Sequence, residues 1–254
     1  MIHLLTALIL TASVPAAHAE GPAPAASAAP AAAPTVGEGS IVRPTFVVGD
    51  EKATAGTGFF ARIGGATVLV TSHGLLGPNG GLPTLLKPAE VATVTQVVLT
   101  DAWTGRGTAK AGPGLVVADA ATVVESPSRD LAVFRVNLSG FDTVATPTYT
   151  PPAPLALATL APKVGDIVWL ASPVKGSDQR VHAAKVGDVS AAALYVDFVE
   201  KIDLVGTSGA PFLNAKGEVV GMCVGGGLLE GVVIGAANPA SSIASRTTQA
   251  LGAR

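Results

Sequence analysis

The chain has 254 residues, of which 16 are lysine or arginine and 18 are aspartate or glutamate, so its formal net charge is −2. Only 13% of the residues are charged, and this balance does not favour binding to nucleic acid or to an anionic membrane surface. Aromatic residues make up 4% of the chain, and its short apolar runs are broken by glycine and proline, which is typical of an all-β protein.

The first 19 residues have the pattern of a signal peptide. Residues 4–14 form an apolar run that is far shorter than the ~20 residues of a membrane-spanning helix. Residues 17–19, Ala-His-Ala, then fit a cleavage site. No lysine or arginine precedes the apolar run, so an uncleaved anchor or a misplaced start codon is the alternative. We expect export to the periplasm or the medium and removal of residues 1–19, which leaves no stable membrane span.

The next segment, residues 20–40, is rich in alanine and proline and has almost no bulky apolar side chains, which predicts a disordered linker. The folded domain is therefore expected over residues 41–254. Its single cysteine, Cys223, excludes an intrachain disulfide. Because Cys223 lies in an apolar run, we expect a buried, unreactive thiol and not a nucleophile.

Short β-type runs closed by turn residues fill the folded part. A hairpin is expected over residues 56–72, with Gly64 and Gly65 at its turn. The other expected strands of the first half cover residues 41–48, 91–100, 114–126 and 131–136. A proline-dense segment, residues 142–162, is expected to cross between two halves. The expected strands of the second half cover residues 166–172, 181–189, 193–199, 210–214, 218–224 and 231–237.

Only the end of the chain has a helical pattern. Asn238 can cap this helix, and Pro239 suits its first turn. Two sets of about six short strands predict an all-β fold of two packed six-stranded antiparallel barrels with a short C-terminal helix. We expect the first barrel over residues 41–145, and the second barrel with the helix over residues 163–254.

A serine between glycines is the strongest chemical signal in the sequence. Ser208 lies between Gly206 and Gly209, in a stretch that continues as Pro211 and an apolar strand. The small residues allow a tight turn, so the N–H groups of Gly206 and Ser208 can converge on one point. Two such donors form an oxyanion hole, and losing one of them typically costs ~10²–10³ in rate.

This stretch resembles the nucleophile loop of the chymotrypsin-like (trypsin-like, PA clan) serine proteases, and most of all the Deg/HtrA-type and other bacterial trypsin-like peptidases. The similarity continues through residues 56–60, 68–74, 129–136, 165–190 and 231–251. It implies a serine endopeptidase that hydrolyses peptide bonds in proteins or peptides. By resemblance, Ser208 is the nucleophile, His73 the general base and Asp130 the carboxylate that orients the base, in the chain order of the chymotrypsin class.

The resemblance also suggests a pocket for the substrate side chain, lined by Ile202, Val224, Gly225 and Gly226. These residues provide no carboxylate, so we expect a small or apolar side chain there. No cluster of histidine, cysteine and aspartate has the spacing of metal ligands, so we expect no metal and no cofactor. Thr207 replaces the aspartate that trypsin-like zymogens use for activation, so activation by that ion pair is not expected. The sequence does not indicate the oligomeric state.

The position of the histidine leaves two interpretations open. The family pattern has two residues between the threonine and the histidine, whereas here Thr71 is followed by Ser72 and then His73. If a deletion lies in the preceding hairpin, His73 is the base. If it does not, the base position falls on Gly74, and the protein is a catalytically inactive homologue that acts as a binding or scaffold protein. A shift of one residue would redirect the ring away from the serine, and His182 is expected to be an ordinary strand histidine.

Overall fold

The computed structural model describes residues 32–116, 127–136 and 153–252. The predicted signal peptide, residues 20–31 of the predicted linker and residues 142–152 of the expected crossing segment lie outside this part.

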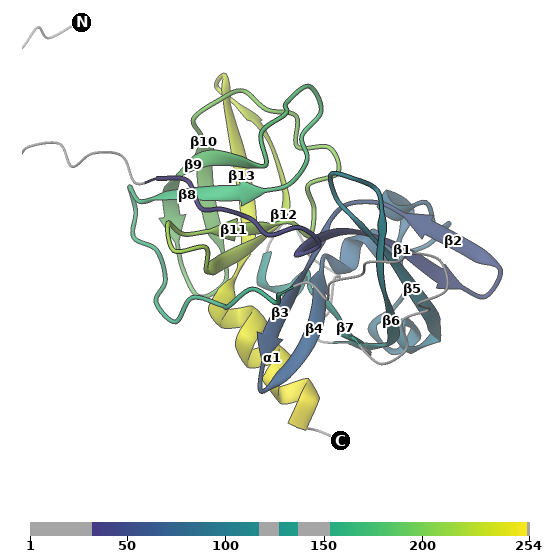
Figure 1. Cartoon of the computed structure of the whole chain (residues 1–254). Coiled ribbons are helices and arrows are strands. Elements are labelled where there is room, and N and C mark those ends of the chain that lie inside the picture. Colours follow the sequence, from purple (N-terminus) through teal and green to yellow (C-terminus); the bar gives the residue numbers. More distant parts are fainter. Residues whose placement is uncertain (1–31, 117–126, 137–152, 253–254) are drawn as a thin grey trace, which may run out of the picture. The chain divides into compact units, whose positions relative to one another are not determined.

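Seven antiparallel strands form the first sheet, in the order β2-β1-β3-β4-β7-β6-β5. Strand β1 also pairs with β5 over most of its length, so the sheet curls round on itself (Figure 1). The strands are β1 (Ile41–Val48), β2 (Glu51–Thr54), β3 (Gly58–Ile63), β4 (Ala66–Thr71), β5 (Val94–Asp101), β6 (Gly107–Val116) and β7 (Ala132–Val136).

The second sheet is a closed barrel of six strands, in the order β10-β13-β12-β11-β8-β9. Its strands are β8 (Ile167–Ala171), β9 (Val181–Val189), β10 (Leu194–Phe198), β11 (Pro211–Leu213), β12 (Val219–Leu229) and β13 (Val232–Pro239). One helix, α1 (Ala240–Gly252), follows directly after β13 (Figure 1).

The alternation of side chains along the strands builds three hydrophobic clusters. Phe60 and Leu69 point into the first barrel, whereas their neighbours Phe59 and Val68 belong to a cluster shared with the second barrel. Successive residues of a strand face opposite sides, so the same strands line the barrel and the contact between barrels. The shared cluster includes Met222 of β12 and reaches Ile243 of α1, while the second barrel has its own core.

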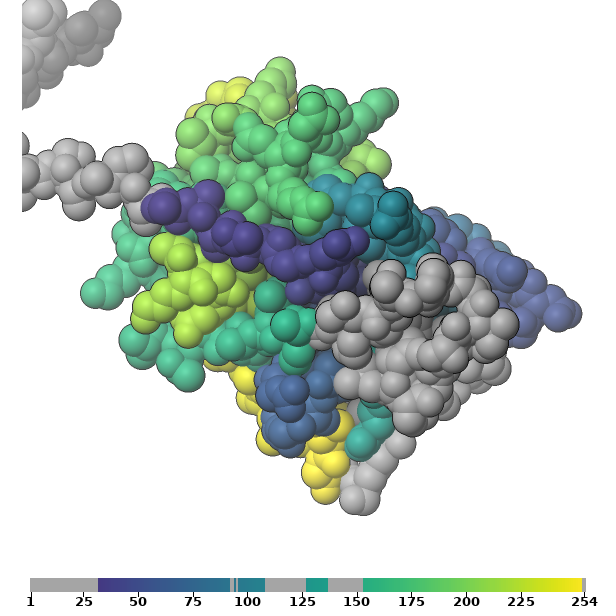
Figure 2. Space-filling view, viewed as in Figure 1, coloured from purple at the N-terminus to yellow at the C-terminus, as the bar shows by residue number. Residues whose placement is uncertain are grey.

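The end of the predicted linker packs against the folded domain. Val36 is 7% exposed and belongs to the cluster shared by the barrels, and the N–H of Gly39 donates to Asp101 at 2.9 Å. The space-filling view shows these first described residues lying along the surface of the domain (Figure 2). Burial alone would raise the pKa of Asp101, but the hydrogen bonds that it accepts from Thr104, Gly39 and Trp103 hold that pKa below its ordinary value.

The predicted fold class is confirmed, but strand bounds differ in both barrels: β12 continues to Leu229, beyond the expected end at residue 224. Residues 117–126 of the expected strand 114–126 lie outside the described part. Strand β2 was not expected, and β6 begins at Gly107 instead of residue 114. Four 3₁₀-helices were also not expected: η1 (His73–Leu76), η2 (Pro78–Gly80), η3 (Pro88–Thr93) and η4 (Pro127–Arg129). In the part of the chain that the structure describes, no helix has the length and hydropathy needed to cross a membrane.

Substitutions on the buried and exposed sides of β7 should change the free energy of unfolding by different amounts. Phe134 is fully buried, and its ring lies 5.6 Å from the ring of Phe46 between centroids. Phe134→Ala should lower the free energy of unfolding by about 3–5 kcal/mol because it leaves a cavity. Arg135→Ala, on the exposed side of the same strand, should change it by less than about 0.5 kcal/mol. Denaturant unfolding measures both values, and equal losses would contradict the assigned facing of β7.

Candidate functional site

The loop that carries Ser208 lies between β10 and β11 and depends on two glycines. Gly206 has φ +82° and Gly209 has φ +89°, in the left-handed region that favours glycine. Ser208 is partly exposed, and its Oγ donates to the carbonyl oxygen of Val224 at 3.3 Å. Among the described residues, the N–H groups of Gly206 and Ser208 donate no hydrogen bond to the protein. The two amides expected to form an oxyanion hole are therefore available to a ligand oxygen.

The predicted acid, Asp130, is buried between η4 and β7 and is 1% exposed. One carboxylate oxygen accepts a hydrogen bond from Ser72 Oγ at 2.6 Å, and the other accepts one from the N–H of Gly74 at 2.9 Å. Burial raises the pKa of Asp130 above its ordinary value, and the bonds from Ser72 and Gly74 and the nearby His73 offset this only in part. The carboxylate is therefore held by the segment that follows β4.

The second barrel fixes the main chain of the same acid. Asn238 is fully buried on β13, and its side-chain amide donates to the carbonyl oxygens of Ser128 at 3.3 Å and Asp130 at 3.2 Å. The expectation that Asn238 caps the helix and that Pro239 lies in its first turn is wrong: both residues end β13, α1 begins at Ala240, and Asn238 Oδ1 has no hydrogen-bond partner in the described structure. The bonds of the Asn238 amide join residues more than a hundred positions apart, so no local pattern in the sequence predicts them.

The predicted base, His73, begins the 3₁₀-helix η1 and is 1% exposed. Its Nε2 lies 2.8 Å from the carbonyl oxygen of Leu86. A carbonyl oxygen can only accept a hydrogen bond, so Nε2 is the donor and carries the proton. In the triad mechanism, Nε2 of the base must instead accept the proton of the serine hydroxyl. In this arrangement the ring nitrogen that the mechanism needs is bound to the main chain.

Gly74, the alternative base position, lies directly beside the carboxylate. A Cβ atom at this residue would lie 3.4 Å from Ser72 Oγ and 3.8 and 3.9 Å from the two carboxylate oxygens of Asp130. These are ordinary contact distances, and Gly74 is not among the glycines with positive φ. A side chain at position 74 would therefore start next to Asp130. The sequence signal for this arrangement was the single residue between Thr71 and His73.

The residues predicted to line the substrate pocket are divided between two places. Val224, Gly225 and Gly226 line an open pocket on β12, whereas Ile202 packs against the core of the second barrel. The remaining lining is apolar except for one phenol: Pro127, Tyr195, Gly227, Leu228, Leu229, Ile234 and Ala236. Strand β11 pairs with β12 only through residues 219, 221 and 222. Among the described strands, residues 225–229 of β12 therefore pair only with β13.

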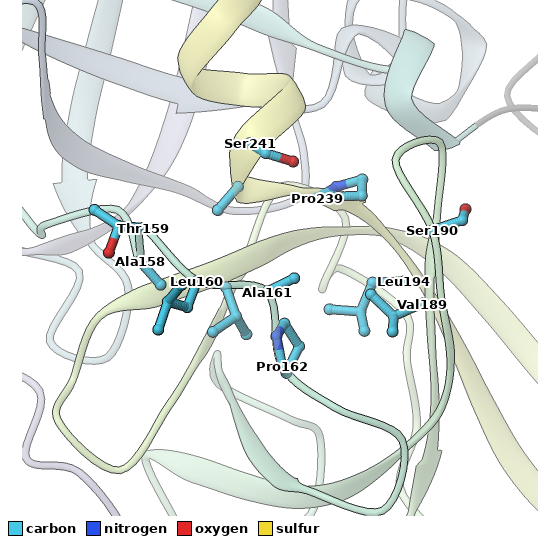
Figure 3. A pocket seen from close by; sticks show the side chains of 12 residues that line it. Ala158, Thr159, Leu160, Ala161, Pro162, Val189, Ser190, Leu194, Pro239 and Ser241 are labelled. Atoms are coloured by element: carbon cyan, nitrogen blue, oxygen red, sulfur yellow. The ribbon is translucent and has the colours of Figure 1, made fainter.

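Three other places also contain polar groups: His182, Cys223 and the pocket at the start of α1. His182 is 2% exposed, and burial lowers its pKa, an effect opposed by nearby Glu200. Burial raises the pKa of the Cys223 thiol to about 11. The pocket at the start of α1 has hydroxyls but no charged side chain in its lining (Figure 3). Within the described ranges, no three His, Cys, Asp or Glu side chains lie close enough together to hold a metal ion.

Comparisons with known proteins agree with this architecture. The family model described as a trypsin-like peptidase domain matches residues 56–222. The Rv3671c protease of M. tuberculosis, in its inactive form, is 18% identical with a TM-score of 0.51, over 83% of this chain and 88% of that chain. The HtrA-type protease AlgW with tripeptide is 16% identical with a TM-score of 0.50, over 84% of this chain and 60% of that chain.

The serine endoprotease from Yersinia pestis is also 16% identical with a TM-score of 0.50, over 84% of this chain and 62% of that chain. The chain therefore spans less than two thirds of the length of these last two proteins. Comparison with curated protein sequences gives no match. At such identities the structural similarity shows the fold alone.

The raised pKa of Asp130 predicts a specific pH dependence of stability. In the pH range between the ordinary value of 3.8 and the raised pKa, the folded protein binds more protons at this carboxyl than the unfolded chain does. This contribution to the free energy of unfolding should therefore grow as the pH falls through the raised pKa. Asp130→Asn cannot titrate and should remove it. Denaturant unfolding of both proteins between pH 7 and pH 4 measures the difference, and parallel curves would contradict the raised pKa.

Proposed function

Because this chain belongs to the trypsin-like peptidase family, we propose that it is a serine-protease homologue that binds an extended peptide beside Ser208 without cleaving it through a Ser-His-Asp triad. The fold is that of a trypsin-like peptidase, and the loop around Ser208 resembles the nucleophile loop of these enzymes. The proposed departure concerns the general base alone, because the base position falls on Gly74.

The observation that carries the proposal is the hydrogen bonding around Asp130. Its carboxylate accepts from Ser72 Oγ and from the N–H of Gly74, while Nε2 of His73 donates to Leu86. In a working triad the carboxylate orients an imidazole that accepts the serine proton. Here a glycine stands where a side chain would meet the carboxylate. Without a base, only the residual rate that comes from the oxyanion hole and binding is expected, at ~10³–10⁴ over water.

Peptide binding is supported by the free edge of β12. Its residues 225–229 have main-chain groups on the side away from β13 that are not used in any described strand pairing. An exposed strand edge is a template for an added strand. The apolar pocket on the same stretch offers space for side chains of the added strand. The free amides of Gly206 and Ser208 can bind a main-chain oxygen of the peptide at the end of this edge.

The competing function is a serine endopeptidase in which His73 is the base. Family membership and the presence of both Ser208 and Asp130 favour it. It requires the His73 ring to leave the carbonyl of Leu86 and to turn toward Ser208. The labelling experiment below separates the two functions.

We also propose that the protein acts outside the cytoplasm. The apolar run of residues 4–14 followed by the Ala-His-Ala sequence supports export and cleavage after Ala19. The alanine- and proline-rich residues that follow would then separate the folded domain from its new N-terminus.

The proposed function predicts that Ser208 is unreactive in the wild-type protein. A fluorophosphonate probe should label the wild-type protein no faster than the Ser208→Ala variant, because no base removes the serine proton. Gly74→His should speed labelling by at least ~10²-fold, since it places an imidazole next to Asp130. Gel fluorescence and intact mass measure the label. An extended apolar peptide should slow the labelling of Gly74→His by competition.

Gly74→Ala is the matched control for this experiment, because it adds the same Cβ atom without the imidazole and should stay unlabelled. Rapid labelling of the wild-type protein that is lost in both His73→Ala and Ser208→Ala would refute the proposal and identify His73 as the base. Competition by the peptide is the separate test of binding, and its absence would refute a peptide-binding cleft.

Export leads to a separate prediction. When the full chain is expressed with an intact secretion pathway, N-terminal sequencing of the secreted or periplasmic protein should read from Glu20. A mature chain that still begins at Met1, or that stays in the cytoplasm, would contradict the signal peptide.

A further inference from the structure

Thr57 connects the first barrel to the Ser208 loop through both its main chain and its side chain. It is fully buried just before β3. Its N–H donates to the carbonyl oxygen of Ser208 at 2.9 Å, and its hydroxyl donates to the carbonyl oxygen of Gly206 at 2.9 Å. One residue of the first barrel therefore binds two carbonyl groups of the loop that belongs to the second barrel.

The two carbonyl groups that Thr57 binds lie on either side of one peptide unit of the loop. The carbonyl of Gly206 belongs to the peptide unit before Thr207, and the carbonyl of Ser208 belongs to the peptide unit after Ser208. Peptide units are planar and rigid, so fixing both carbonyls restrains the unit between them. That middle unit carries the N–H of Ser208, one of the two amides expected to bind an oxyanion. Its own carbonyl, from Thr207, is held by the N–H of Ala210 at 2.9 Å.

Close contact between the loop and Thr57 makes this restraint stiff. A Cβ atom at Gly209 would lie 1.9 Å from the carbonyl oxygen of Thr57, so only glycine allows the approach. The same carbonyl oxygen accepts a hydrogen bond from Thr71 Oγ1 at 2.7 Å. Thr71 immediately precedes Ser72, which holds Asp130. The end of β4, which precedes the residue that binds Asp130, therefore also fixes Thr57.

We propose that Thr57 is a positioning residue whose hydroxyl and N–H together aim the N–H of Ser208 at a ligand oxygen. The hydroxyl is the part that this sequence adds to the main-chain bond, because any residue other than proline could supply the N–H. This inference concerns the site of the proposed function, but it requires only that the loop bind an oxygen, whether or not the protein cleaves peptides.

A boronic acid tests this role without a general base in the protein. The Ser208 oxygen adds to the trigonal boron of 2-phenylethylboronic acid, its proton passes to the buffer, and boron becomes a tetrahedral anion with an oxygen in the oxyanion hole. Boron-11 NMR and titration calorimetry follow this adduct in the full chain, and Ser208→Ala should abolish it. Thr57→Val keeps the N–H and removes the hydroxyl, and it should weaken binding by about tenfold. Thr57→Ser should restore it to within about twofold.

A matched control separates positioning from a general loss of stability. Thr247 on α1 is also fully buried, and its hydroxyl has no hydrogen-bond partner in the described structure. Thr247→Val should therefore leave boronate binding unchanged. If Thr57→Val does not fold, Thr57→Ala and Thr57→Ser provide the comparison of a residue without and with a hydroxyl.

Three outcomes would overturn the role of Thr57. Unchanged binding in Thr57→Val shows that the hydroxyl does not position the loop. Failure of Thr57→Ser to restore binding shows that the methyl group, and not the hydroxyl, matters. Absence of an adduct in the wild-type protein shows that the amides are not arranged around an oxygen. The first two outcomes concern the Thr57 side chain alone and leave the expected labelling of Gly74→His unchanged, so the role of Thr57 can fail while the proposed function stands.

Discussion

The arrangement of the segments around Asp130 depends on the burial of its carboxylate. A carboxylate that is 1% exposed needs hydrogen-bond donors, and here they come from Ser72 and the N–H of Gly74. These donors bring the segment after β4 onto the acid, and Asn238 brings β13 onto its main chain. In a protease, an imidazole would take one of these positions. In this chain the donors next to β4 bind the carboxylate, and they offset the effect of its burial only in part.

The contact between the barrels is held by a few polar bonds within an apolar surface. Phe59, Val68 and Met222 supply the apolar part. The bonds from Thr57 and Asn238 cross this surface at two places, one at the Ser208 loop and one at the acid. Arg180 of the second barrel also lies over the ring of Trp103, 4.8 Å from its centroid. Apolar packing brings the barrels together, and the directional bonds decide which loops face each other.

Much of this arrangement could be predicted from sequence, because strand alternation and glycine positions are local signals. The hairpin turn at Gly64 and Gly65 and the loop around Ser208 lie where their residue types require. The orientation of His73 could not be predicted in this way. It depends on the 3₁₀-helix η1 and on the carbonyl of Leu86, which no local pattern connects to the histidine. The sequence showed that one residue is missing between Thr71 and His73. The hydrogen bonds of His73 and Gly74 were needed to argue which of the two residues occupies the base position.

The burial of the Cys223 thiol has a consequence for how the protein would respond to oxidation. It is fully buried beneath the Ser208 loop, near the hydroxyl of Thr207, and burial raises its pKa to about 11. Disulfide exchange proceeds through the thiolate, which such a group scarcely forms at neutral pH. An oxidising compartment would therefore neither crosslink two copies through sulfur nor convert this residue to a sulfenic acid while the barrel stays closed. The sulfur would become reactive only when unfolding exposes it.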